Sequence, residues 1–81
     1  MAYAEMKNES AREIARKCTF EEIIAGLRKA QEELAGHERE WCGMIGTEWE
    51  VAERNERRAM LRKLLKAYQR KAADVFASIA A

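Results

Sequence analysis

Proline is absent from this 81-residue chain, and glycine occurs only four times. These two residues interrupt helices most strongly, because proline lacks a backbone N–H and glycine loses the most conformational entropy on folding. No segment alternates apolar and polar side chains as a half-exposed β-strand does. The sequence therefore predicts an all-α fold, and its length fits one helical domain spanning residues 1–81.

Three helix starts are marked by a hydroxyl residue that precedes a glutamate by three positions. In this capping-box pattern the hydroxyl and the carboxylate each accept a hydrogen bond from a backbone amide that the helix leaves unpaired. The pairs are Ser10 with Glu13, Thr19 with Glu22, and Thr47 with Glu50. Around the second pair, Cys18 and Ile23 also have the spacing of a hydrophobic staple.

The chain is expected to reverse near Gly43 and Gly46, because glycine readily adopts the left-handed backbone conformation that ends helices. The predicted architecture is an antiparallel two-helix hairpin of the coiled-coil kind, with helices over about 20–43 and 48–79 and a short N-terminal helix over about 10–17. A thin core at this chain length favours an oligomer. One unbroken rod through Gly46 is the alternative.

Each long helix carries an apolar stripe at about 100° per residue, as a helix that buries one side requires. The stripe of helix 20–43 comprises Phe20, Ile23, Ile24, Leu27, Leu34, Trp41 and Ile45. The stripe of helix 48–79 comprises Leu61, Leu64, Leu65, Tyr68, Ala72, Val75, Phe76 and Ile79. The last of these extend past the hairpin partner, so we expect helix 10–17 to cover them with Ile14, Ala15 and Cys18.

Continued towards its N-terminus, the stripe of helix 48–79 meets Arg54, Arg57 and Arg58 where leucines are expected. In the hairpin, residues whose numbers sum to about 91 face each other, which places Glu38 opposite Arg54. The sequence thus predicts a structural ion-pair layer of Glu38, Glu50 and Arg54. The alternative left open is that the three arginines form a site for a phosphate or an acidic partner.

The formal net charge is +1, which argues against an acidic DNA mimic and against a strongly basic nucleic-acid coat. The charges are nevertheless unevenly placed. Residues 1–50 carry eleven acids and seven bases, whereas residues 51–81 carry three acids and eight bases. Opposed halves of this kind suit a chain that folds back on itself or stacks with copies of itself.

Cys18 and Cys42 are too few for a disulfide scaffold and lack zinc-ligand spacing, so both are expected to be reduced core thiols. No run without a charge is longer than that of residues 41–47, which is far shorter than the ~20 apolar residues that cross a bilayer. Charged residues also interrupt the N-terminal segment, unlike a signal peptide. We expect a cytoplasmic protein with no membrane contact.

Little in the sequence resembles a catalytic centre. His37 is the only histidine and is expected to be solvated or interhelical. Adjacent carboxylates such as Glu32 and Glu33 diverge by about 100° on a helix and cannot act on one substrate atom. His37 and Cys42 lack the spacing of a shared metal ion, and no glycine-rich phosphate loop is present. The sequence predicts no enzyme, no metal site and no cofactor.

Binding is the remaining class of function. Trp49 is predicted to point with Met60 towards the outer side of helix 48–79, where a tryptophan makes a good interface anchor. The resulting hypothesis is a small non-enzymatic interaction or adaptor module that self-associates or binds a protein partner through apolar helix faces. A nucleic-acid-binding regulator that uses Arg54, Arg57 and Arg58 is the alternative.

A third possibility is a chaperone or subunit of a secretion or phage assembly. The Trp41–Gly43 segment resembles the Trp-x-Gly turn of small hairpin proteins exported by type VII secretion, but Ala72 stands where their export signal, which begins at a tyrosine such as Tyr68, has an acid. The Leu27–Leu34 segment is similar to hairpin co-chaperones of type III secretion needles. Neither similarity assigns the chain to a family.

Overall fold

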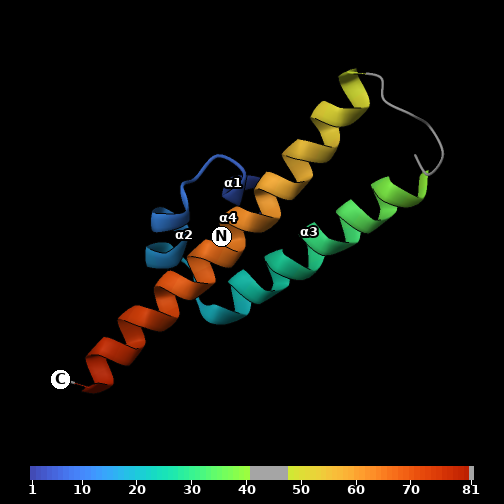
Figure 1. The fold of residues 1–81 in the computed structure, drawn as a ribbon. Coiled ribbons are helices and arrows are strands. Elements are labelled where there is room, and N and C mark those ends of the chain that lie inside the picture. The colour runs from blue at the N-terminus through green and yellow to red at the C-terminus, as the bar shows by residue number, and fades with distance from the viewer. Residues whose placement is uncertain (41–47, 81) are drawn as a thin grey trace.

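The computed structural model describes the backbone of residues 1–40 and 48–80, and within them the side chains of residues 1–37 and 51–79. These residues form an all-helical fold without strands, which confirms the predicted fold class (Figure 1). The helices are α1 (Tyr3–Met6), α2 (Ala11–Lys17), α3 (Phe20–Glu40) and α4 (Glu48–Ala80). The glycine turn and the cap at Thr47 lie outside the described residues.

Two of the predicted helix starts have capping hydrogen bonds. Ser10 Oγ accepts from the backbone N–H of Glu13 at 3.2 Å, directly before α2. Before α3 the capping box is reciprocal, since Thr19 Oγ1 accepts from the Glu22 N–H at 3.2 Å and Glu22 Oε1 accepts from the Thr19 N–H at 3.1 Å. Local sequence therefore fixes where α2 and α3 begin.

The sequence did not predict α1, because four residues without a side-chain cap have no helical signal of their own. Tertiary packing holds it instead. Met6 is 1% exposed, and its Sδ lies so close to Gly26 of α3 that a Cβ at that glycine would be 3.0 Å from it. Met6 thus packs α1 against α3 at Gly26.

Helices α3 and α4 lie side by side and run in opposite directions (Figure 1). At one end of their contact, the rings of Phe20 and Tyr68 meet edge to face with centroids 5.5 Å apart. At the other end, His37 Nε2 lies 3.6 Å from a carboxylate oxygen of Glu53. An aromatic contact and a polar contact thus join α3 to α4 at two levels of the described residues.

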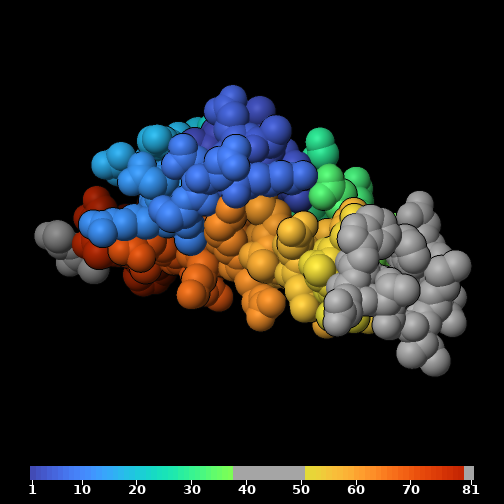
Figure 2. All heavy atoms as spheres, turned by 90° about the horizontal axis from the view of Figure 1, so that it is seen from above, coloured from blue at the N-terminus to red at the C-terminus, as the bar shows by residue number. Residues whose placement is uncertain are grey.

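The core lies where α1 and α2 cover one side of the α3–α4 pair; Figure 2 shows them lying over α4. Its buried residues are Met6, Ile14, Ala15, Cys18, Ile23, Ala30, Met60, Leu64 and Ala67. Cys18 is a buried free thiol, as predicted. Three of these nine residues are alanines and none is aromatic, so the core is thin.

The predicted stripes are only partly buried. Ile23 and Leu64 are fully buried, but Ile24, Leu65 and Tyr68 are exposed by 36%, 43% and 37%. The apolar side chains of each long helix span a wider arc around the helix than one neighbouring helix can cover. Because α1 and α2 pack on one side, they rotate the buried face towards that side and leave the other half uncovered.

The expectation that the helix over about 10–17 covers the end of α4 is wrong. Val75, Phe76 and Ile79 are exposed by 42%, 77% and 79%. The cover ends near Lys71, whose Nζ donates to the Ala15 carbonyl oxygen at 3.2 Å. Figure 1 shows the C-terminal part of α4 projecting past the ends of α2 and α3.

Truncation of the two neighbouring leucines tests which half of the stripe is buried. Leu64→Ala should lower the free energy of unfolding by about 3 kcal/mol, because it leaves a cavity in the core. Leu65→Ala removes the same atoms from a side chain that is 43% exposed and should cost less than about 1 kcal/mol. Urea unfolding followed by circular dichroism measures both. Equal losses would place both leucines in the core.

Glu22 gives the fold a pH dependence. Hydrogen bonds from the N-terminal ammonium group and the Thr19 amide lower the pKa of Glu22 from its ordinary value of 4.5 to about 2. A carboxyl whose pKa is lower in the folded state stabilises the fold above its ordinary pKa, and that stabilisation is lost as pH falls towards 2.

Glu22→Gln keeps a side chain that can cap Thr19 but removes the charge. Urea midpoints should therefore fall more steeply between about pH 5 and pH 2.5 for the unchanged protein than for this variant. Parallel pH profiles would show that the charge of Glu22 does not stabilise the fold.

Candidate functional site

The three arginines predicted as a site differ in burial. Arg54 and Arg57 are half-buried, whereas Arg58 is exposed. Consecutive residues diverge by about 100° around a helix, so Arg57 turns towards the cleft between α3 and α4 while Arg58 turns away. Arg54 precedes Arg57 by three positions and Arg58 by four, so it neighbours both on the surface of α4, and a binding site made of the three arginines stays a prediction.

Met60 is buried, at 8% exposed, so the prediction that it points to the outer side of the helix is wrong. It lies one helical turn before Leu64 on the same face, and α1 extends the buried sector to reach it. The remaining predicted site residues have side chains outside the described residues: Glu38, Trp49 and Glu50. The predicted ion-pair layer of Glu38, Glu50 and Arg54 therefore stays a prediction.

A different polar contact joins α3 to α4. The Glu53 carboxylate lies 3.6 Å from both His37 Nε2 and Arg57 Nη1, and Arg57 also donates to the Glu53 backbone carbonyl at 3.3 Å. His37 is 4% exposed, which makes it interhelical, one of its two predicted placements. Sequence reasoning missed Glu53, although its place four residues before Arg57 is the spacing of a helical ion pair.

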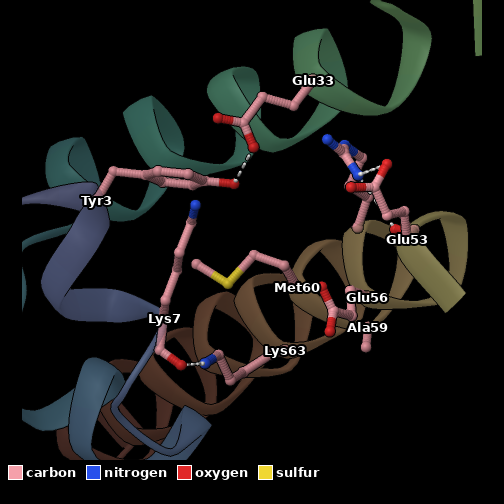
Figure 3. Close-up of a pocket in the computed structure, with 9 residues that line it drawn as sticks. Tyr3, Lys7, Glu33, Glu53, Glu56, Ala59, Met60 and Lys63 are labelled. Atoms are coloured by element: carbon pink, nitrogen blue, oxygen red, sulfur yellow. Dashed lines mark hydrogen bonds and ion pairs between the residues drawn. The ribbon is translucent and has the colours of Figure 1, made fainter. Parts of the chain in front are cut away.

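Beside this contact, a pocket of about 490 Å³ opens between α1, α3 and α4 (Figure 3). Its lining residues are Tyr3, Lys7, Glu33, Glu53, Glu56, Arg57, Ala59, Met60 and Lys63. The Tyr3 hydroxyl donates to Glu33 at 3.2 Å, and the Lys7 and Lys29 ammonium groups lie 5.2 and 5.1 Å from the centre of its ring. The polar groups of the wall thus contact one another.

Burial shifts the pKa of two residues in the pocket wall, Tyr3 and Lys63. Burial, followed by the charge of Glu33, raises the pKa of Tyr3 to about 12, so its hydroxyl stays protonated and acts as a hydrogen-bond donor. Burial lowers the pKa of Lys63, whose Nζ donates to the Lys7 carbonyl at 3.0 Å. Among the described residues, no three His, Cys, Asp or Glu side chains group to hold a metal ion.

Five bases and no acid stand between Arg62 and Lys71 of α4. Two of them serve the fold, since Lys63 and Lys71 donate to carbonyl groups at the C-terminal ends of α1 and α2. A cation is favourable there because the carbonyls at a helix end carry partial negative charge. Arg62, Lys66 and Arg70 are exposed.

The most prominent surface feature is an uncovered apolar strip that starts on α3 and continues to the end of α4. We define the strip as Ile24, Leu65, Tyr68, Val75, Phe76 and Ile79, with exposures from 36% to 79%. At 100° per residue its five α4 members fall within an arc of about 100° and so share one helix face. Contiguous apolar surface of this kind marks interaction sites on small proteins.

None of the described helices is long and apolar enough to cross a membrane. Comparison with known proteins yields no relative: no protein-family model, no curated protein and no solved structure matches the chain. The case for a function therefore depends on the geometry of the strip, the pocket and the charged residues.

The Glu53 contact is testable by truncation. Glu53→Ala should lower the free energy of unfolding by about 1 kcal/mol, because buried His37 and half-buried Arg57 lose a carboxylate partner. Glu56→Ala, an exposed glutamate on the same pocket wall, should change it by less than about 0.5 kcal/mol. Thermal and urea unfolding of the two variants give the comparison. A larger loss for Glu56→Ala would mean that Glu53 does not join the helices.

Proposed function

We propose that this protein is a small, non-enzymatic helical interaction or adaptor module that associates with protein through its apolar helix faces. The observation that supports the proposal is the strip, which extends over α3 and α4 and leaves Phe76 and Ile79 more than three-quarters exposed. Burial of apolar surface is the main favourable contribution to most protein associations.

The thin core supports the same proposal. A chain of this size buries only about 60% of the surface that its unfolded state exposes, so further burial against a partner adds stability that the monomer lacks. In the proposed architecture α3 and α4 form an antiparallel hairpin closed by residues 41–47, with the strip along one side. Buried Cys18 has a free thiol, which fits the proposed cytoplasmic setting.

Two other functions remain as proposals of lower rank. Nucleic-acid binding through Arg54, Arg57 and Arg58 is less favoured, because Arg57 contacts Glu53, and because Lys63 and Lys71 of the same helix donate to carbonyl groups of the fold. A chaperone or subunit of a secretion or phage assembly would use the same apolar strip, with an assembly protein as its partner.

Charge placed on the strip tests the proposal. Ile24→Glu with Leu65→Glu should abolish association of the full chain, whether with itself in light scattering or with a protein captured from the native host. Raising the salt concentration should leave apolar association largely intact. The matched control, Ala25→Glu with Lys66→Gln, makes the same change of −2 in net charge at exposed positions outside the strip on the same two helices and should bind as the unchanged protein does.

Steep loss of binding as salt rises, with DNA or RNA as the ligand, would favour the nucleic-acid alternative. A chain that stays monomeric and captures no protein in a strip-dependent manner would contradict the interaction module.

A further inference from the structure

We propose that a second copy of this chain covers the strip, with the two α4 helices packed antiparallel so that residues whose numbers sum to about 140 face each other. The proposal rests on the proposed function and names its partner. It is argued from the spacing, the shape, the charge and the area of the exposed surface.

The spacing is that of a coiled-coil seam. Along α4, apolar residues recur at alternating intervals of four and three: Leu61, Leu65, Tyr68, Ala72, Val75 and Ile79. This heptad pattern is what a helix presents to one other helix of its own kind. The buried residues of α4 are Met60, Leu64 and Ala67, and of the seam residues only Leu61 also packs against the core.

The two halves of the seam have complementary shapes. Its first half, from Leu61 to Tyr68, lies beside α3, where Leu61 packs against the core and Tyr68 meets the Phe20 ring. Its second half, from Ala72 to Ile79, projects beyond α2 and α3 as a bare helix (Figure 1). In an antiparallel pair, each projecting half lies on the α3–α4 surface of the other copy.

This register also matches large side chains with small or medium ones. A sum of about 140 places Tyr68 opposite the partner's Ala72 and Leu65 opposite the partner's Val75. Leu61 falls opposite the partner's Ile79. Because the contact is two-fold symmetric, each of these pairs occurs twice. Two chains therefore cover the seam along its whole length, and no third chain is needed.

Charge favours the antiparallel direction. Residues 62–71 of α4 carry five bases and no acid, whereas residues 72–81 carry a single charge, Asp74. Parallel helices would align the two base-rich segments and repel each other. Antiparallel helices place each base-rich segment beside the nearly uncharged, slightly acidic end of the other copy.

One base, Lys71, lies at the margin of the seam close to the two-fold axis. Its ammonium group is directed to the core side of α4, where it donates to the Ala15 carbonyl at 3.2 Å and lies 5.6 Å from the centre of the Phe20 ring. The seam itself contains no charged residue from Leu65 to Ile79.

The exposed area suits a small dimer. The six side chains of the strip present on the order of 600 Å² per copy, close to the ~800 Å² that each partner buries in a standard interface. Most of this area is on α4, which therefore supplies the contact. A two-fold pair would cover both strips at once.

The mass of the full chain in solution gives the first test. Sedimentation equilibrium should show twice the 9.3 kDa of one chain at about 100 μM. Val75→Glu with Ile79→Glu should weaken dimerisation tenfold or more, while helicity stays unchanged because both side chains are exposed in the monomer. The control, Ala73→Glu with Ala77→Glu, adds the same charges off the seam and should remain dimeric.

Cysteine crosslinking in a Cys42→Ser background tests the direction. Mixing a Leu65→Cys chain with a Val75→Cys chain should give a disulfide-linked dimer under mild oxidation, whereas Val75→Cys alone should not. Efficient crosslinking of Val75→Cys with itself would show parallel helices and overturn the proposal.

A chain that is monomeric at every concentration would also overturn the proposed dimer. If such a monomer still captures a host protein, and Ile24→Glu with Leu65→Glu abolishes the capture, the interaction module stands with a different partner. If it captures nothing, the proposed function fails as well.

Discussion

The close approach of three helices at Gly26 determines how the rest of the molecule is arranged. Leu64 of α4 and Met6 of α1 both lie against this glycine, and a side chain there would meet the Met6 sulfur at 3.0 Å and the Leu64 Cδ1 at 3.4 Å. Because Gly26 has no Cβ, both α1 and α4 can approach α3 closely at this residue. The position of α1 in turn brings Tyr3 to Glu33 and creates the pocket.

One-sided packing is the consequence of that approach. With α1 and α2 on the side of Met6 and Ile14, the other half of each apolar sector is left exposed by the rest of the described residues. A chain of this length has too few residues to cover both sides, because surface is large relative to volume in small domains. The uncovered half, together with the projecting end of α4, is the feature from which we infer association.

The charged residues have more than one role, and only some are available to a ligand. Lys63 and Lys71 satisfy carbonyl groups at helix ends, and Glu53 contacts both His37 and Arg57 between α3 and α4. A count of bases in the sequence therefore overstates the cationic surface of α4. Arg62, Lys66 and Arg70 remain on the exposed side and keep the base-rich segment positive.

The sequence alone determined the fold class and the starts of α2 and α3, because proline content and the Ser10 and Thr19 caps act within a few residues of chain. It also determined that Cys18 is a buried thiol. Packing alone decided α1, whose four residues have no helical signal without Met6 in its site.

The tertiary structure also decided that Met60 is buried while Leu65 and Phe76 are exposed. Helical periodicity defines an apolar sector but not its centre, and the centre depends on which side of the α3–α4 pair α1 and α2 occupy. The same limit hid the contact of Glu53 with His37, which requires the relative rotation of two helices. Local interactions thus specified the helices, and long-range packing specified which of their faces meet.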